Sequence, residues 1–403
     1  MTLRQRLLAG LALSATTLLA AAACGPGLFD GLTGGDAGRD TGPTQTGAVC
    51  NLAVPPAAPT NADSTEDPEI YFAFDQIKID TRPSPDGGIA PPTGFDLDGL
   101  CTVCDPDAGN IPTPASCVVP PSATGTVSPL CDLSNGRDNN LAVMFNTLLS
   151  NIPQATTDFA SQKIQQGIFT ILVDLKGWNG NDDDPDVDVT VYGSQGLDTT
   201  DGGSPLPKFD GTDTWSLDPR SIFDGPSKVG VDCRLDISFC TPLPTQVSQM
   251  GNAYVSGGTL VAKFASVPIN IATNVGNLTF DLDQPELVAK LTKDADGRFR
   301  MLGQFIGRWP TTKALPAIAS LSFPIAGKVA PLCTNPTFYT VVKAVVCAEP
   351  DLPAQADGGA GAPCGAISSA IEFSASSEAR PSFVFERPDA GAPCAGFSDT
   401  CVR

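Results

Sequence analysis

The sequence LVAKLTKDADGRFRMLGQFI, residues 287–306, decides the fold class. Two runs rich in apolar residues, 287–292 and 298–306, lie on either side of Asp294-Ala295-Asp296-Gly297. Asp and Gly tolerate the backbone angles of a tight turn, and apolar runs on both sides of such a turn predict a β-hairpin. The same arrangement recurs around Gly257-Gly258. Repeated hairpins of this kind predict antiparallel sheets.

Other stretches predict the remaining secondary structure. Residues 69–80 are apolar and partly alternating, and Val187, Val189 and Val191 alternate with polar residues, as in strands with one face in the core. Further strands are predicted at 168–175, 229–239, 253–256, 259–264, 277–283 and 367–374. Short helices are predicted at 141–152 with Asp138 or Asn139 as N-cap, at 158–166, at 312–321, and at 336–346 with Asn335 as N-cap.

The composition also favours β-structure. The chain has 403 residues, with 40 Gly and 37 Pro, and only 17% of its residues are charged, which favours turns and short strands over long helices. Hydrophobic residues make up 41% of the chain, enough for a substantial core. We therefore expect a mainly β fold, namely an antiparallel β-sandwich of the jelly-roll or lectin-like type with a few short helices and disulfide staples.

The N-terminal segment is typical of an export signal. Arg4 and Arg6 supply positive charge, residues 7–23 are apolar and uncharged, and small residues precede Cys24. The sequence Leu18-Leu19-Ala20-Ala21-Ala22-Ala23-Cys24-Gly25 resembles the signal of bacterial lipoproteins. The resemblance implies that Cys24 becomes a lipidated N-terminus anchored by its acyl chains, and that Gly25 directs the protein to the outer membrane.

One position departs from the lipoprotein pattern. Lipoprotein signals prefer Leu, Val or Ile three residues before the cysteine, where this chain has Ala21. Ala21 also suits cleavage by the general signal peptidase, which would secrete the protein without a lipid. Both alternatives export the chain, and we expect no later stretch to be apolar enough to span a membrane.

Four regions are expected along the chain. They are a signal peptide at 1–23, a tether rich in Gly, Pro and Asp at 24–63, a β-rich ectodomain at 64–380, and a C-terminal tail with a local cysteine loop at 381–403. The tether is predicted because Gly and Pro at this density cannot bury enough apolar surface to offset the entropy of ordering the chain.

The cysteines are expected to form structural disulfides. The chain has 13 Cys, and lipidation of Cys24 leaves 13 − 1 = 12, an even number that can pair completely. In an exported chain such cysteines usually cross-link loops. Their spacing suggests local loops at Cys233 with Cys240 and at Cys394 with Cys401, and a link from the last helix to the last strand through Cys347 with Cys364; the other candidates are Cys101, Cys104, Cys117 and Cys131.

The sequence Cys101-Thr102-Val103-Cys104 also has the spacing of a redox motif. A redox motif normally opens a helix in a β-α-β unit, so two structural disulfides are the favoured interpretation.

Charge and composition exclude several classes of function. The net charge of −20 repels nucleic acid, so we expect no nucleic-acid partner. The chain contains no His, which excludes Ser-His-Asp and Cys-His nucleophile systems and zinc sites with His ligands. An enzyme with this sequence would need carboxylates, Lys or Tyr.

The densest group of oxygen-bearing side chains lies in GWNGNDDDPD, residues 177–186. Calcium takes about six to eight oxygen ligands, so this loop is a candidate calcium site with the ligands Asn179, Asn181, Asp182, Asp184 and Asp186. It is not an EF-hand, because it lacks the central Gly and the closing Glu. Asp96-Leu97-Asp98-Gly99 is a second candidate of the same kind. Solvated turns are the alternative interpretation of both.

Trp178, next to this loop, has two interpretations. It could stack on a sugar beside a cation, or it could pack in the core, which is the favoured interpretation because Trp side chains are usually well buried.

These observations favour a lipid-anchored cell-envelope protein with a non-catalytic ectodomain for binding, adhesion or surface structure. The expected partners are the membrane, through the lipid, and a glycan or another envelope protein. The alternative is a secreted glycan hydrolase that uses a carboxylate pair, for which Glu286 and Glu372 lie in or beside predicted strands. No residue is assigned as catalytic.

Overall fold

The structure is a computed structural model. It describes residues 51–60, 69–79, 93–105, 111–113, 116–119, 131–133, 135–151, 159–198, 206–222, 233, 239–248, 253–273, 276–325, 328–358, 361–377, 379–382, 394 and 396–401.

Strands dominate the described residues. They are β1 (Ile70–Lys78), β2 (Val103–Asp105), β3 (Ile111–Thr113), β4 (Thr170–Lys176), β5 (Asp188–Leu197), β6 (Thr214–Leu217), β7 (Ala253–Ser256), β8 (Thr259–Lys263), β9 (Ser266–Thr273), β10 (Gly276–Lys293), β11 (Phe299–Pro310), β12 (Ser322–Ile325), β13 (Lys328–Pro331), β14 (Leu352–Pro353), β15 (Cys364–Ser377) and β16 (Arg380–Ser382). The α-helices are α2 (Asn140–Asn151), α3 (Phe159–Gln165), α6 (Thr311–Ala319) and α7 (Pro336–Val346).

Most of the strands belong to one 12-stranded sheet. Its order is β16-β6-β5-β4-β1-β15-β11-β10-β8-β7, with β14 beside β15 and β9 beside β10. The pairing of β16 with β6 is parallel, and the other pairings in this sheet are antiparallel. The hairpin predicted around residues 294–297 joins β10 to β11, and Gly297 there has a φ of 85°.

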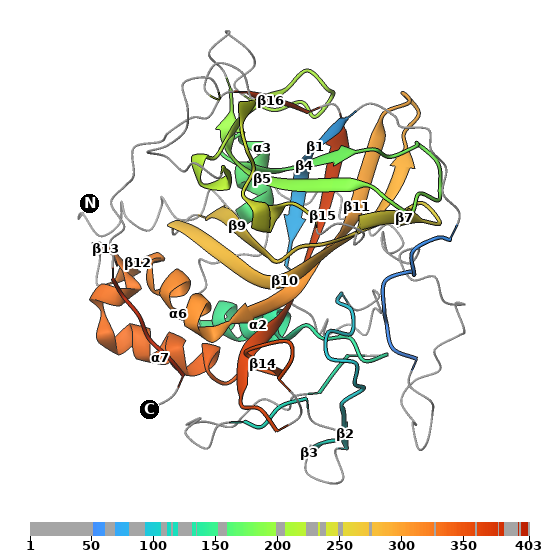
Figure 1. The fold of residues 1–403 in the computed structure, drawn as a ribbon. Coiled ribbons are helices and arrows are strands. Elements are labelled where there is room, and N and C mark those ends of the chain that lie inside the picture. Colours follow the sequence, from blue (N-terminus) through green and yellow to red (C-terminus); the bar gives the residue numbers. More distant parts are fainter. Residues whose placement is uncertain are drawn as a thin grey trace, which may run out of the picture.

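The sheet bends so far that its edge strand β7 meets the segment before β5 (Figure 1). Asp184 N donates to Val255 O at 2.8 Å, and Val255 N donates to Asp184 O at 2.7 Å. Val187 N also donates to Ala253 O at 3.1 Å. Because of this bend, β4 and β5 and the strands β8 to β10 line one common apolar core.

The helices cover the open sides of this core. Leu141 and Met144 of α2 are fully buried, and the Phe145 ring lies 6.1 Å from that of Phe280 on β10. Helices α6 and α7 lie together at one end of the molecule, away from β7 (Figure 1). None of the helices in the described part of the chain is long and apolar enough to cross a membrane.

A second, smaller apolar cluster lies on the other face of the sheet. It consists of Phe95, Tyr254, Val261, Val288, Ile306 and Ala370. Its strand residues alternate with residues of the main core, such as Leu287 and Phe305, and therefore point to the opposite face. Phe95 brings residues 93–100 onto this face, and these residues contribute to the candidate site described below.

Most of the predicted elements are present, and the prediction of a mainly β fold with short helices and disulfides is confirmed. The helix α7 has its predicted bounds, with Asn335 Oδ1 accepting from Phe338 N at 3.1 Å as the N-cap. The stretch 229–239 is different, because its described residues Cys233 and Phe239 lie in helical turns. The two layers around the core belong to one continuous sheet, so a jelly-roll or lectin-like sandwich stays a prediction.

Four disulfides join described cysteines: Cys117–Cys364, Cys233–Cys240, Cys333–Cys394 and Cys347–Cys401. Cys101 and Cys131 are disulfide-bonded as well. The prediction of structural disulfides is therefore confirmed, and it is consistent with an exported protein. Cys24 and the side chain of Cys104 lie outside the described residues.

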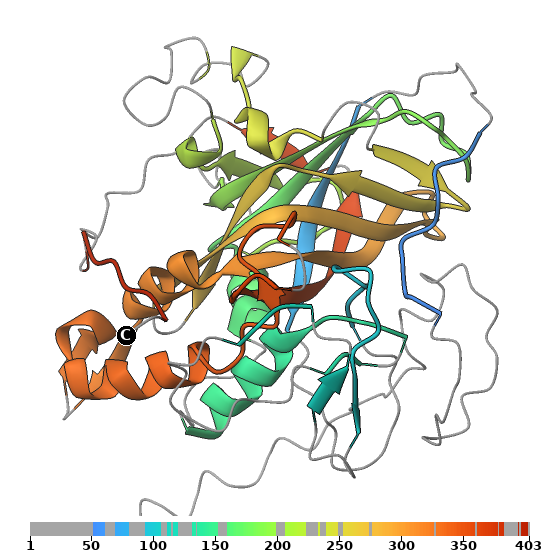
Figure 2. The same ribbon diagram turned by 60° about the horizontal axis from the view of Figure 1, so that its bottom comes forward.

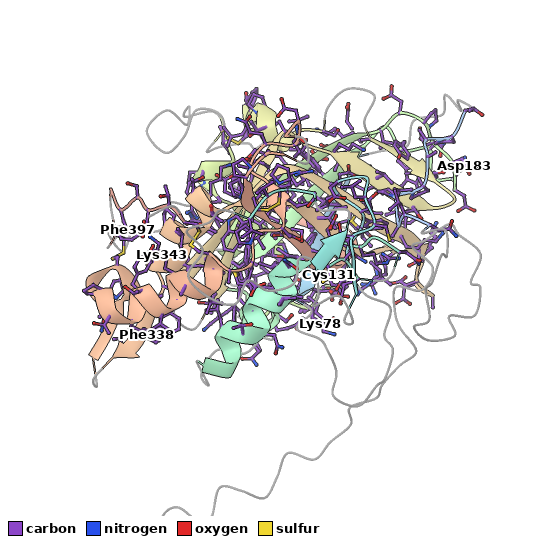
Figure 3. All side chains as sticks on the ribbon, turned by 90° about the horizontal axis from the view of Figure 1, so that it is seen from below. Lys78, Cys131, Asp183, Phe338, Lys343 and Phe397 are labelled. Atoms are coloured by element: carbon purple, nitrogen blue, oxygen red, sulfur yellow. A yellow bond between two sulfur atoms is a disulfide. The ribbon has the colours of Figure 1, made fainter. Side chains whose placement is uncertain are left out.

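Two of the predicted disulfide pairs are wrong. Cys394 does not pair with Cys401, because the tail folds back along α7 and brings these cysteines to Cys333 and Cys347. Asp399 in the tail accepts from Tyr339 Oη at 2.9 Å and from Lys343 Nζ at 2.7 Å, and Figure 3 shows Phe397 beside Lys343.

The predicted pair of Cys347 with Cys364 is wrong for a related reason. Cys364 begins β15 and lies beside residues 117–118, where Cys364 N donates to Val118 O at 2.9 Å and Val118 N donates to Ala362 O at 2.8 Å. This backbone pairing brings Cys364 to Cys117, which is 247 residues away in sequence.

Candidate metal centre

The site begins with a tight turn at Asp96-Leu97-Asp98-Gly99. Asp96 Oδ1 accepts from Asp98 N at 3.2 Å and from Gly99 N at 2.8 Å, and Asp98 Oδ1 accepts from Leu100 N at 2.7 Å. Short Asp side chains commonly bond the backbone two residues further on, so this turn follows from its local sequence. Each of these two carboxylates therefore has one oxygen engaged in the turn.

Asp138 comes to this turn from a different part of the chain. Its backbone N donates to Phe95 O at 3.1 Å, and its Oδ2 accepts from Leu97 N at 2.7 Å. The prediction of Asp138 or Asn139 as the helix cap is resolved in favour of Asn139, whose Oδ1 accepts from Ala142 N at 3.4 Å. Asp138 is 3% exposed, so the turn holds a carboxyl group that is almost completely buried.

The three carboxyl groups of Asp96, Asp98 and Asp138 form one cluster. One carboxylate oxygen of each lies within 4.8 Å of the corresponding oxygens of the other two. We call these three residues the acid cluster. Among the described residues it is the one place where at least three carboxylate, thiol or imidazole groups come this close together.

Two side chains of β11 attach the segment that carries Asp96 and Asp98 to the sheet. Gln304 Oε1 accepts from Gly94 N at 2.8 Å, and Arg308 Nη2 donates to Leu97 O at 2.6 Å. Arg137 Nη1 donates to Gly94 O, and its guanidinium lies 5.6 Å from the centre of the Phe95 ring. These contacts fix the turn to the sheet by its backbone.

Gly94 is required where the two segments meet. Its φ is +113°, and a Cβ atom added there would lie 2.6 Å from the backbone oxygen of Asp138. Both the backbone conformation and the space therefore exclude a side chain, so the absence of one lets Asp138 approach the turn.

The environment of the cluster strongly disfavours negative charge. Burial, together with the charges of Asp351, Asp98 and Asp132, raises the pKa of Asp138 to about 10. Burial and the charges of Asp98 and Asp351 raise the pKa of Asp132 to about 7, and burial raises the pKa of Asp96 as well. These shifts have the physical cause expected when several acids share a site with little water.

Neighbouring acids raise one another's pKa in this region. Besides burial, the charge of Asp98 adds to the rise in the pKa of Asp96, and the charge of Asp132 adds to the rise in the pKa of Asp138. Asp98 Oδ2 is buried and accepts no hydrogen bond from the N–H or hydroxyl groups of the described residues. Carboxyl groups held this close together with little water favour a proton or a cation among their oxygens, so the arrangement can bind either.

The predicted calcium loop at 179–186 is arranged differently. Asp184 Oδ2 accepts from Asn179 N at 2.8 Å, and Asp184 Oδ1 accepts from Asp186 N at 3.2 Å. Asn179 Oδ1 accepts from Asn181 N at 2.9 Å, so the loop uses these oxygens for its own backbone. Asp182, Asp184 and Asp186 do not form a group of three carboxylates as close as the acid cluster, so calcium binding by Asn179, Asn181, Asp182, Asp184 and Asp186 stays a prediction.

Trp178 packs in the core, as favoured by the sequence. It is 4% exposed, its ring meets that of Phe299 edge-on at 4.8 Å, and its Nε1 donates to Asn181 O at 2.9 Å. No face of this ring is left as a platform for a sugar.

The two glutamates considered for a hydrolase do not face each other across a cleft. Glu286 on β10 forms an ion pair with Lys263 Nζ at 2.9 Å. Glu372 on β15 lies opposite Gln304, whereas Glu286 lies opposite Ile306, so β11 separates the two acids. Glu372 is also buried, at 5% exposed, so this side chain has little access to a substrate.

Sequence reasoning found two of the three members of the acid cluster and missed Asp138. Asp138 follows Asn135-Gly136, both with positive φ, and the resulting sharp turn directs the chain back toward Asp96. An Asn-Gly turn just before an acid was the available signal, but it does not specify which other acid is met. No protein-family model matches the chain, and neither the curated proteins nor the solved structures contain a significant match.

Proposed function

We propose that this protein is a lipid-anchored envelope protein whose non-catalytic ectodomain binds one calcium ion at the acid cluster. The observation that carries the calcium assignment is the 4.8 Å limit on the distances between oxygens of Asp96, Asp98 and Asp138. Calcium binds oxygens at about 2.3 to 2.6 Å, so two ligands of one ion lie at most about 5 Å apart. Magnesium demands near-ideal octahedral geometry and usually keeps several waters, so a site built from three carboxylates suits calcium better.

The bonding of the three acids supports this assignment. Asp96 Oδ1, Asp98 Oδ1 and Asp138 Oδ2 accept backbone N–H groups, and the second oxygen of each bonds no N–H group of the described residues. Asp98 Oδ2 in particular is buried without a donor. An ion at the acid cluster would give Asp98 Oδ2 the partner that it lacks and would replace the protons that burial favours, and water or carbonyl groups would complete its coordination.

Two kinds of observation support the envelope location. The described cysteines form disulfides, as expected in an oxidising compartment outside the cytoplasm. The apolar segment before Cys24 resembles a lipoprotein signal. Replacement of Cys24 by Ser should abolish incorporation of labelled palmitate and release the protein from the membrane fraction. Continued labelling of the variant would refute the lipid anchor.

Calorimetric titration tests the calcium assignment. Chelator-treated protein should bind one calcium ion, and Asp98→Asn should weaken binding at least about tenfold because it removes a charged ligand. Asp182→Asn is the matched control, because it removes an acid from the loop at 179–186 and should leave the affinity unchanged. Magnesium should bind more weakly than calcium. Absence of calcium binding at millimolar concentrations would refute the proposal.

A further inference from the structure

A short segment of the chain, residues 52–56, lies between the two parts of the acid cluster. We call these residues the strap. Ala53 N donates to Asn135 O at 2.8 Å, and Asp96 N donates to Ala53 O at 2.8 Å. One residue of the strap is therefore bonded on one side to the turn that leads into Asp138 and on the other side to Asp96 itself. Figure 2 shows the strap in blue along the side of the molecule, with the teal residues 93–105 beside it.

Packing adds to these two hydrogen bonds. A Cβ atom added to Gly136 would lie 2.7 Å from Leu52 Cδ2, so Leu52 packs directly on the turn. Ala53 is 8% exposed, whereas Val54 is 55% exposed. The strap is thus attached mainly through Leu52 and Ala53, at the point where it touches the cluster.

A second attachment lies farther from the acids. Tyr254 on β7 donates a hydrogen bond from its Oη to Pro56 O at 2.7 Å. Tyr254 belongs to the smaller apolar cluster on the sheet, together with Phe95. The strap therefore has one attachment that depends on the position of the acids and one that depends on the sheet.

The strap lies within the stretch predicted as a tether, residues 24–63, so this part of the stretch packs against the ectodomain. The chain that precedes the strap leads to Cys24, the residue expected to carry the lipid. Undocking of the strap would lengthen the connection between membrane and ectodomain. Docking of the strap therefore sets how the ectodomain is held at the membrane, if Cys24 is the anchor.

We infer that calcium at the acid cluster controls the docking of the strap. This inference rests on the proposed function. An ion bound by Asp96, Asp98 and Asp138 holds together the two segments to which Ala53 is bonded. Without the ion, this bridge between the two segments is missing, and a separation of the segments breaks at least one of the two hydrogen bonds of Ala53. The strap and the ion therefore stabilise each other, as any two linked binding events do.

Hydrogen exchange on the full mature chain tests this inference. The strap has amide hydrogens only at Leu52, Ala53 and Val54, because Pro55 and Pro56 have none, so a peptide over this segment reports mainly on Ala53. We expect exchange in this peptide to be at least about tenfold faster in chelator than in millimolar calcium. Asp98→Asn should exchange fast in both conditions, and a peptide from the centre of β15 should not change.

Tyr254→Phe tests the reverse effect, that of strap docking on calcium binding. Loss of its hydroxyl removes the second attachment of the strap without adding charge to the cluster. Because coupling is reciprocal, this variant should bind calcium about two- to tenfold more weakly in the calorimetric titration. Calcium binding without any change in exchange of the strap peptide would overturn the inference and leave the calcium site standing. Absence of calcium binding would overturn both.

Discussion

Two acidic regions of this protein differ in how their carboxylates are used. The loop at 179–186 carries three consecutive aspartates, and the acid cluster combines Asp96 and Asp98 with Asp138 from a distant part of the chain. Figure 3 places the first region at Asp183 and the neighbourhood of the second at Cys131, in separate parts of the molecule. The loop at 179–186 has more acids close together in the sequence, but the acid cluster has its carboxylates closer together in space.

The difference lies in the supply of hydrogen-bond donors. In the loop, both oxygens of Asp184 accept backbone N–H groups, and Asp183 Oδ1 accepts from Gly257 N at 2.8 Å. In the acid cluster, backbone N–H groups bond one oxygen of each acid, and Asp98 Oδ2 is buried without a partner. A group of acids becomes a candidate cation site when the fold brings carboxylates together without enough hydrogen-bond donors to satisfy them. The number of acids in a short stretch of sequence does not reveal whether such donors are present.

The largest effect is expected from Gly94→Ala. The new Cβ would meet the backbone of Asp138 in a residue whose φ is +113°, and this clash should destabilise the fold by about 2 to 4 kcal/mol and weaken calcium binding. Gly99→Ala is the matched control in the same turn: its φ is +77°, but nothing lies within 4 Å of the added atom, so it should cost only about 1 kcal/mol. Urea unfolding in calcium measures both. Equal losses would contradict the close approach at Gly94.

The comparison predicts a calcium-dependent stability for one region only. At a calcium concentration of 100 times Kd, the wild-type free energy of unfolding should rise by about 2.7 kcal/mol relative to chelator. Asp138→Asn should lose this increment, yet in chelator it should be about as stable as wild type, because burial raises the pKa of Asp138 to about 10 and Asn replaces a neutral carboxyl group with a neutral amide of the same shape. Asp182→Asn should keep the full increment. Thermal unfolding of the three proteins, each with and without calcium, decides between the two regions.

A third prediction concerns the loop at 179–186. Asp184→Ala leaves the N–H groups of Asn179 and Asp186 without their acceptor, so it should destabilise the fold by about 1 to 3 kcal/mol. The loss should be the same in calcium and in chelator, because this aspartate serves the backbone. A loss that appears only in calcium would assign the ion to this loop instead.

Asp174 on β4 extends the comparison to an acid outside both regions. It is 1% exposed, and burial raises its pKa to about 7 even though Lys176 Nζ lies 3.2 Å away. Between its ordinary pKa of 3.8 and about 7, the folded state holds a proton that the unfolded chain has lost, so stability falls as the pH rises through this interval and levels off above it.

Asp174→Asn should remove this pH dependence. At pH 8 the variant should be more stable than wild type by about 1 to 2 kcal/mol, and at pH 4 the two should be nearly equal. Asp188→Asn, an exposed acid on the neighbouring strand β5, is the control and should keep the wild-type pH profile. Urea unfolding between pH 4 and pH 8 measures the effect. A variant less stable than wild type at pH 8 would show that the ion pair with Lys176 outweighs the burial of the charge.

The local elements were predictable because their signals are local. The β10–β11 hairpin follows from a turn sequence between two apolar runs, and α7 follows from Asn335 and Pro336 at its start. The Cys233–Cys240 disulfide was also predictable, since its ends lie only seven positions apart in the sequence. The other described disulfides join residues 54 to 247 positions apart, and sequence spacing does not contain that information.

The sequence by itself determined the β-rich class, the turn of Asp96 and Asp98, the need for disulfides and the lack of any histidine chemistry. These properties depend on composition and on contacts within a few residues. Only the tertiary structure decided which distant acids meet and which distant cysteines pair. Asp138 reaches Asp96 because both segments pack on the same face of the bent sheet, where Gly94 leaves room for the contact. Contacts between distant segments depend on the packing of the whole sheet, which no local pattern encodes.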